Sequence, residues 1–220
     1  VKVSSILRET IYGMRSTIRV FPRQLWVLAI MGMLLGLGAS IASPFYAPYA
    51  TVNVIRLSNA QWGLITTSVI IITAFFSLPF AWLADNKGKV KLILPSLTLA
   101  PLTIVAFAYS QNFLQVFLAS FAFTILGSMG AGASQALFTD HSSHEHRGRI
   151  NALWSIIGTV QTFSFGATSG SVLGAVGNLL GGFIYGNVSR SLPLLIQACL
   201  VAASATIGLL FLREPSKRAD

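Results

Sequence analysis

Long apolar stretches without charge constrain this chain more than any other feature. The runs free of Asp, Glu, Lys and Arg that are long enough to matter cover residues 24–55, 57–84, 92–139, 150–189 and 191–212. A helix needs about 20 apolar residues to cross the hydrocarbon core of a bilayer, and each run reaches that length. Charged residues make up only 10% of the chain, whereas an average soluble domain has about 25%. We therefore predict an integral membrane protein.

The run 92–139 is long enough for two spans, and the polar sequence Tyr-Ser-Gln-Asn at 109–112 predicts a turn between them. Each other run supplies one span. The expected fold is all-α and polytopic, with a six-helix domain at 24–212 between a basic segment at 1–23 and a tail at 213–220. We expect the spans at roughly 24–50, 61–84, 92–109, 113–139, 150–187 and 191–212.

The placement of the basic residues predicts the orientation. Of the fifteen Lys and Arg residues, thirteen lie before the first span, between the second and third, between the fourth and fifth, or after the sixth. Only Arg56 and Arg190 lie on the other side. Cytoplasmic loops are enriched in Lys and Arg, so we expect a multi-pass protein of the cell membrane with both termini in the cytoplasm. The net charge of +9 therefore indicates membrane orientation and not nucleic-acid binding.

The basic segment 1–23 has two interpretations. Arg8, Arg15 and Arg19 fall near one helical face and apolar residues near another, which suits a helix lying on an anionic leaflet. The alternative is a solvated basic segment that the insertion machinery retains in the cytoplasm.

Small residues recur every four positions in two of the predicted spans. They are Gly32, Gly36, Ser40 and Pro44 in the first span, and Gly166, Gly170, Gly174, Gly182 and Gly186 in the fifth, where Asn178 fills the gap. Such stripes allow helix backbones to approach closely in a bilayer. We expect these faces to be packing faces, with bending of the long fifth span as the alternative.

The segment 80–92, FAWLADNKGKVKL, joins the second and third spans. The Asp85 carboxylate ends a helix beside several cations, Gly88 allows a tight reversal, and Lys89 anchors at anionic headgroups. The segment resembles the signature that the major facilitator superfamily carries between its second and third helices, commonly written G-x-L-a-D-r-x-G-r-k. Ala81 replaces the leading glycine and Asn86 the basic residue after the aspartate.

Other segments extend the resemblance diffusely over 24–215. Residues 59–84 are similar to the family's approach to this loop, and 140–149 to its connection between the fourth and fifth helices, which Arg147–Gly148–Arg149 ends. Residues 177–182 resemble the G-P-x-x-G-G element of the fifth helix, with Asn178 at the proline position. Arg213–Glu214–Pro215 resembles a frequent ending of a six-helix half.

The resemblance implies a transporter of a small molecule that works by alternating access. Family members usually have two six-helix halves around a site near the bilayer midplane. This chain supplies one half, and we expect the C-terminal half in preference to the N-terminal one. The second half would come from the same chain or from a second copy. Asp85, Gly88, Lys89 and Arg147 are then the expected gating residues.

Polar residues at mid-span depth are the candidates for binding the substrate. The candidates are Ser43, Tyr46, Gln135, Gln161 and Asn178. Most Ser and Thr hydroxyls in the spans can form hydrogen bonds to the backbone of their own helix. The larger polar side chains of this set are harder to satisfy in that way. No Asp, Glu, Lys, Arg or His falls within the hydrocarbon depth of a predicted span. We therefore expect no proton-coupling residue in this half, and pairing of Asp85 and Asp140 with nearby cations.

A membrane-embedded enzyme or a metal-binding protein is the alternative. His141, His144 and His146, with Glu145 between them, could collect zinc or supply acid–base chemistry. The residues lie in a short loop followed by two arginines, which favours a solvated loop. We expect no enzyme, no cofactor and no metal site.

Overall fold

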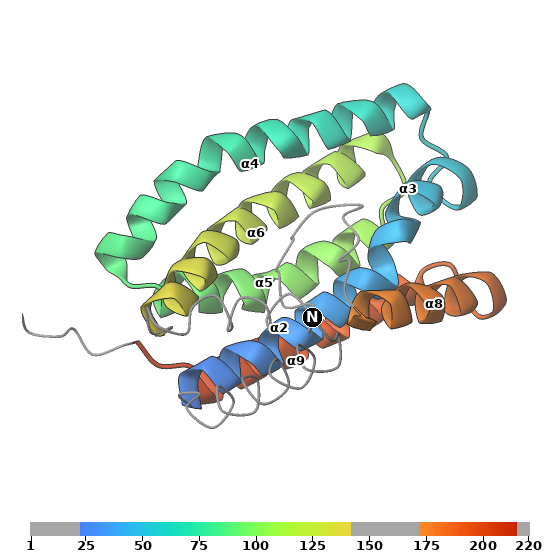
Figure 1. Ribbon diagram of the computed structural model, residues 1–220. Coiled ribbons are helices and arrows are strands. Elements are labelled where there is room, and N and C mark those ends of the chain that lie inside the picture. The colour runs from blue at the N-terminus through green and yellow to red at the C-terminus, as the bar shows by residue number, and fades with distance from the viewer. Residues whose placement is uncertain (1–22, 142–171, 215–220) are drawn as a thin grey trace, which may run out of the picture.

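The structure is a computed structural model, and it describes residues 23–141 and 172–214. Within these residues the chain is helical apart from short turns and loops, and it forms no strand (Figure 1). The elements are α2 (Arg23–Ala42), η1 (Ser43–Phe45), α3 (Tyr46–Pro48), η2 (Tyr49–Asn53), α4 (Asn59–Lys87), α5 (Val90–Ala108), α6 (Phe113–His141), α8 (Val172–Asn187) and α9 (Leu192–Phe211). The predicted all-α fold is confirmed.

Five helical stretches of the described chain are long and apolar enough to cross a membrane. They are Arg23–Val52, Asn59–Lys87, Val90–Ala108, Phe113–Asp140 and Leu192–Phe211. They match five of the expected spans, and α5 and α6 are separated at the predicted turn. The helix α8 is the described part of the expected fifth span, whose remainder lies outside the described residues.

Local chemistry explains where α4 begins and ends. Ser58 accepts a hydrogen bond from the Gln61 N–H through its hydroxyl, and its own N–H donates to Gln61 Oε1, at 3.2 and 2.9 Å. This reciprocal capping box satisfies donors that the first helical turn would otherwise leave unpaired. At the other end the chain reverses at Gly88, which has a φ of 103°.

The first span is irregular near one end. After α2, the chain passes through the 3-10 helix η1, the short α3 and the π-helix η2. Pro44 and Pro48 lack the backbone N–H that continuous α-helical bonding requires. The wider turn is completed by a bond from the Val54 N–H to the Tyr49 carbonyl, at 3.1 Å. The sequence predicted the position of this span but not its break.

The helices pack in the order α8, α2, α9, α5, α6 and α4, each against the next. The order is symmetric when α2 is matched with α6, α4 with α8, and α5 with α9. The α2–α9 contact then corresponds to the α6–α5 contact, and the α2–α8 contact to the α6–α4 contact. The helices α2, α4, α5 and α6 alternate in direction along the chain, so α2 and α6, which begin the two triplets, run in opposite senses. This arrangement is typical of inverted three-helix repeats nested within one six-helix half.

The helices α2 and α8 approach most closely at Gly177 and Gly181. A Cβ atom at Gly177 would lie 2.6 Å from Ser40 Cβ, and one at Gly181 would overlap the Ile41 carbonyl oxygen. The predicted small-residue face is thus confirmed at Ser40. On α8 the predicted stripe is buried at Gly174, but the prediction was wrong at Gly186, where a Cβ would meet nothing within 4 Å. The glycines of α8 lie on two faces, and spacing alone does not tell which one packs.

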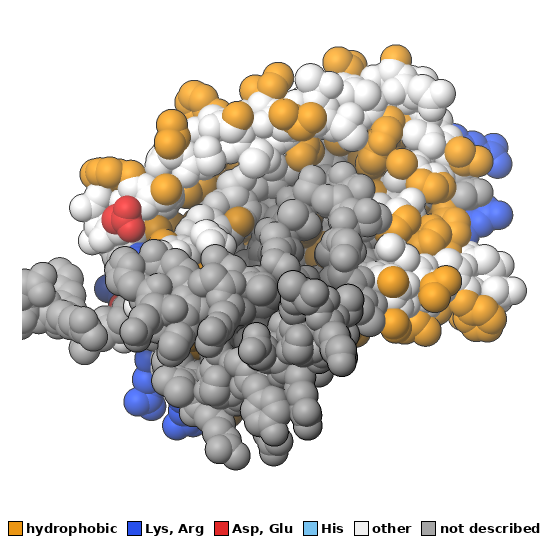
Figure 2. All heavy atoms as spheres, in the orientation of Figure 1, with side chains coloured by type: hydrophobic (Ala, Val, Ile, Leu, Met, Phe, Trp, Pro, Cys, Tyr) orange, Lys and Arg blue, Asp and Glu red, His pale blue; other side chains and the backbone are white. Residues whose placement is uncertain are grey.

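The surface over α4 is covered with hydrophobic side chains (Figure 2). Phe75, Leu78 and Trp82 are 71%, 78% and 66% exposed. On α8, Leu179 and Phe183 are similarly exposed, at 77% and 65%. Exposing so much apolar surface to water is unfavourable, so these faces contact lipid or another protein segment.

Candidate functional site

The turn between α4 and α5 favours a glycine because of its backbone conformation, and the Glu214 carboxylate lies close beside it. Gly88 has a positive φ, which a residue with a Cβ adopts only at a cost. In addition, a Cβ at this position would lie 2.6 Å from Oε1 of Glu214. The predicted importance of Gly88 therefore rests on a contact with the far end of the chain as well as on the reversal itself.

Glu214, the third residue after α9, caps the start of α5. The N–H groups of Lys89 and Val90 donate to Oε1 and Oε2 of its carboxylate, the second at 2.9 Å. The first turn of a helix has unpaired N–H donors and a partial positive charge, so a carboxylate is stabilising there. Sequence reasoning used Glu214 only as part of a family-like ending and missed this role. Its signal was an acidic residue after the last span, on the same side of the membrane as the start of the third.

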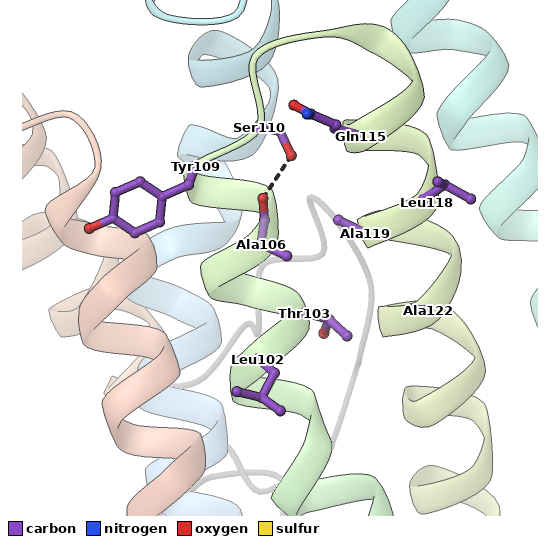
Figure 3. A pocket seen from close by; sticks show the side chains of 9 residues that line it. All are labelled: Leu102, Thr103, Ala106, Tyr109, Ser110, Gln115, Leu118, Ala119 and Ala122. Atoms are coloured by element: carbon purple, nitrogen blue, oxygen red, sulfur yellow. Dashed lines mark hydrogen bonds between the residues drawn. The ribbon is translucent and has the colours of Figure 1, made fainter.

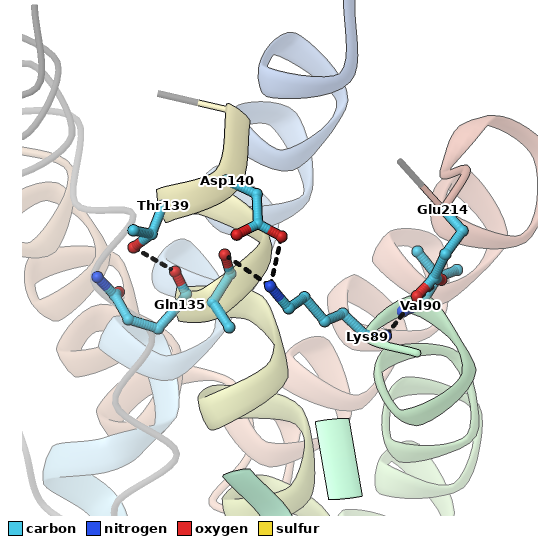
Figure 4. A network of polar contacts seen from close by, with 7 residues as sticks. Lys89, Val90, Gln135, Thr139, Asp140 and Glu214 are labelled. Atoms are coloured by element: carbon cyan, nitrogen blue, oxygen red, sulfur yellow. Dashed lines mark hydrogen bonds and ion pairs between the residues drawn. The ribbon is translucent and has the colours of Figure 1, made fainter. Parts of the chain in front are cut away.

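Lys89 connects α5 to the end of α6. Its Nζ forms an ion pair with Asp140 Oδ2 and lies 3.5 Å from the Ala136 carbonyl oxygen. Figure 4 shows the Lys89 side chain reaching Asp140, with Glu214 at the backbone of the same residue. The expected pairing of Asp140 with a cation is confirmed. We call this set, Gly88, Lys89, Asp140 and Glu214, the Lys89 network, and its end of the bundle the Lys89 end.

Asp85 does not belong to these contacts. Its side chain is exposed, and among the described residues its carboxylate has no hydrogen bond or ion pair. The expected pairing of Asp85 with a cation is therefore not seen in this part of the chain. Arg147 lies outside the described residues, so the gating roles of Asp85 and Arg147 stay predictions.

Tyr46 lies at a junction of α3, α5 and α9. Its side chain is buried, and its hydroxyl donates to Gln197 Oε1 at 2.7 Å. The Tyr46 ring meets Phe107 edge-on, with the ring centroids 4.9 Å apart. Nearby, the Tyr49 hydroxyl donates to the Ala108 carbonyl at the end of α5. Sequence reasoning missed Gln197, although it is the sole amide side chain in the sixth predicted span.

The other described candidates for substrate binding lie on different elements. Ser43 is buried in η1, close to Tyr46 in the chain, whereas Gln135 is exposed on α6 near the Lys89 end (Figure 4). Asn178 lies within α8, and its Oδ1 is buried and has no hydrogen-bond partner among the described residues. Gln161 lies outside these residues. Gln135 therefore lies apart from Ser43 and Tyr46, whereas the neighbouring Gly177 and Gly181 of α8 contact α2 at Ser40 and Ile41, close to Ser43 in the chain.

Most hydroxyls of the spans bond their own helix, as the sequence led us to expect. The hydroxyls of Thr66, Thr73, Thr124 and Ser128 all donate to backbone carbonyls three or four residues earlier. They are therefore weaker candidates for substrate contacts than the amides.

The comparison with protein families decides which class of protein this is. A family model described as Major Facilitator Superfamily matches residues 28–220. The chain belongs to the major facilitator superfamily. No curated protein matches it. Major facilitator proteins are transporters of small molecules in lipid bilayers, and they are not enzymes, so this chain is a multi-pass membrane protein of a transporter family.

The histidine loop gives no support for the alternative. His144 and His146 lie outside the described residues, as does Glu145. Within the part of the chain that the structure describes, no group of three or more His, Cys, Asp or Glu residues could hold a metal ion.

Proposed function

We propose that this chain forms one half of an alternating-access transporter, with the Lys89 network as its cytoplasmic gate. The supporting observation is the convergence of α5, α6 and the end of α9 on one residue, Lys89, through charged groups at helix ends. Such charge-assisted bonds are strong when formed and exchange readily with water when the helix ends separate. They suit an interface that must form in one state and break in another.

The other half would lie against α4 and α8. These helices stand at the two ends of the packing order, and each leaves an apolar face uncovered. A second six-helix half, in the same chain or in a second copy, would bury both faces and enclose a substrate site between the halves.

A neutral or apolar small molecule is the substrate class that the polar groups favour. Within the described spans, Ser43, Tyr46, Asn178 and Gln197 offer hydrogen bonds but no charge. A charged substrate at the midplane would call for an opposite charge there. Asn178 is the strongest candidate, because its buried Oδ1 has no partner among the described residues and could accept a hydrogen bond from a substrate.

The orientation is tested by cysteine labelling of intact cells in a Cys199→Ser background. We expect a membrane-impermeant maleimide to label Asn112→Cys from outside, and Lys87→Cys only after the cells are permeabilised. These two exposed positions lie at opposite ends of α4–α6, so each is the control for the other. Labelling of Lys87→Cys in intact cells would overturn the proposed topology.

The gate is tested by neutralising Glu214, which belongs to the Lys89 network, and Asp85, which does not, in separate variants. Glu214→Gln removes the charge that caps α5, and we expect faster labelling of Ser134→Cys, on the inner part of α6, from the cytoplasmic side. Asp85→Asn, next to the same turn, is the matched variant, and the family resemblance predicts that it impairs turnover while insertion stays intact. An unchanged labelling rate in Glu214→Gln would contradict the gate. Normal turnover of Asp85→Asn would leave Asp85 as part of an ordinary turn.

A further inference from the structure

A groove separates α5 and α6 at the end of the bundle opposite the Lys89 network. Its volume is about 590 Å³. Figure 3 shows Thr103, Ser110, Gln115 and Ala119 between the two helices, below the turn that joins them, whereas Tyr109 and Leu118 point outward at the edges of the groove. The groove takes no part in the proposed gate, and it contains none of the candidate residues for substrate binding.

The depth of the groove corresponds to one leaflet of a bilayer. A rise of about 1.5 Å per residue places Leu102 about 9 Å below Ala108, the last residue of α5, and Ala122 about 10 Å below Gln115 on α6. Half of the hydrocarbon core is about 15 Å thick. Tyr109, at the top of the groove, is 69% exposed, and exposed aromatic residues are typical of the headgroup level.

The lining changes from apolar to polar toward the turn. Ala106, Ala119 and Ala122 leave the space open because their side chains are short, and Leu102 and Leu118 stand at its edges, 65% and 55% exposed. The lone deeper polar group of the lining, the Thr103 hydroxyl, donates to the Ala100 carbonyl at 2.8 Å. The lower part of the groove therefore offers a ligand apolar contacts and, from the described residues that line it, no free hydrogen-bond donor.

The upper rim offers hydrogen-bond donors without charge. Gln115 Oε1 accepts the Gln111 N–H at 2.7 Å, which leaves the amide NH₂ of Gln115 available as a donor. The Ser110 hydroxyl donates to the Ala106 carbonyl at 2.7 Å and can still accept. No Lys, Arg, Asp or Glu is among the residues that line this groove.

We propose that the groove binds one acyl chain of a phospholipid from the leaflet that contains the α5–α6 turn. An apolar space at hydrocarbon depth does not retain water, and when vacant its walls lose dispersion contacts, so a lipid chain is the occupant that satisfies both conditions. The ester or phosphate oxygens of the same lipid would accept hydrogen bonds from Gln115 at the rim. Because the rim is neutral, chain fit and not headgroup charge determines binding.

The proposal is tested by photo-crosslinking, which requires neither transport nor knowledge of the substrate. The full chain is reconstituted into phosphatidylcholine vesicles with a trace of phosphatidylcholine that carries a diazirine on its acyl chain, and adducts are mapped by mass spectrometry. We expect a several-fold enrichment at 102–106 and 118–122 over Leu209 and Leu210, which are equally open on α9, at 57% and 67% exposure.

Variants that fill the groove provide the control. Ala106→Trp and Ala122→Trp should each reduce the adducts in the groove several-fold, whereas Ala203→Trp, on an exposed part of α9, should leave them unchanged. The enrichment should persist in phosphatidylglycerol vesicles. Even labelling of all exposed faces, full labelling in both groove variants, or enrichment that needs an anionic headgroup would overturn the proposal.

Discussion

The interior of the bundle and its Lys89 end are held together by different chemistry. In the interior the ties between helices are neutral. Tyr46 donates to Gln197 at 2.7 Å, and the Ser204 hydroxyl donates to the Met31 carbonyl at 3.3 Å. At the Lys89 end the ties are ionic and lie partly in water, with the side chains of Lys89 and Asp140 15% and 41% exposed.

This difference separates what stays together from what can open. A buried hydrogen bond has no water to replace it, so losing one partner costs about 1–3 kcal/mol. A partly exposed ion pair exchanges its partner for water and contributes only about 0.2–1 kcal/mol. A bundle built in this way can move as a rigid body while one of its ends opens and closes.

Substitution of Gly181 is expected to have the largest effect, because it acts on the tightest contact of the interior. In Gly181→Ala the new Cβ would overlap the Ile41 carbonyl oxygen. Backbone has no rotamer to adjust, so we expect α2 and α8 to separate at a cost of about 1–3 kcal/mol, as in other overpacked cores. The midpoint of unfolding in detergent measures this loss.

Gly186→Ala in the same helix is the matched control. Its Cβ would meet nothing within 4 Å, and alanine favours a helix over glycine by about 1 kcal/mol. We therefore expect unchanged or slightly higher stability. Equal effects of the two substitutions would show that the α2–α8 contact does not limit the stability of the interior.

Removal of the Tyr46 hydroxyl is expected to have the next largest effect. Tyr46→Phe keeps the ring against Phe107 but leaves Gln197 Oε1 without this donor. We expect a loss of about 1–3 kcal/mol, the cost of a buried polar group left unpaired. Gln197→Leu in the same background should recover part of this loss, because it removes the orphaned acceptor. A double-mutant cycle of unfolding midpoints measures the coupling.

The same variants separate two roles for Tyr46. The family resemblance predicts that Tyr46→Phe weakens substrate recognition more than stability, whereas the bond to Gln197 predicts the reverse. Membrane protein level and concentration-dependent transport, measured in parallel, distinguish them. Full stability combined with weaker transport would favour recognition and would remove the Tyr46–Gln197 bond from the ties that hold the interior.

Local sequence patterns predicted most of the spans and two of the turns of this fold. Charge-free runs predicted the spans, and the polar sequence at 109–112 predicted the turn between α5 and α6, because hydropathy is a property of neighbouring residues. The reversal at Gly88 was predicted for the same reason, since a helix end, a glycine and a lysine stand together in the chain.

Partners across the chain could not be predicted in this way. Gln197 lies 151 residues from Tyr46, and Glu214 lies 125 residues from Lys89. The sequence around Gln197 or Glu214 does not indicate which residue will be its partner. Both partners are brought into contact by the packing of α9 against α2 and α5. The choice of Gly181 over Gly182 as a contact likewise depends on how α8 is rotated against α2. Long-range packing thus determined the parts of the site that sequence reasoning missed.

The smallest effect on stability is expected at the Lys89–Asp140 ion pair. Asp140→Asn and Lys89→Met each remove the attraction between the ends of α5 and α6, and we expect losses of about 0.2–1 kcal/mol. The loss should shrink further at high salt, because at 1 M the screening length is only about 3 Å. Lys91→Met is the matched control, since Lys91 is exposed on the same turn and has no ion pair among the described residues.

Unfolding midpoints at low and high salt measure the difference, and a double-mutant cycle isolates the contribution of the Lys89–Asp140 pair. A salt-independent loss as large as that in Tyr46→Phe would mean that the Lys89 end is as firmly tied as the interior. The end would then have to open by breaking a bond that the bundle needs to stay folded, and the Lys89 network would be a structural clamp and not a gate.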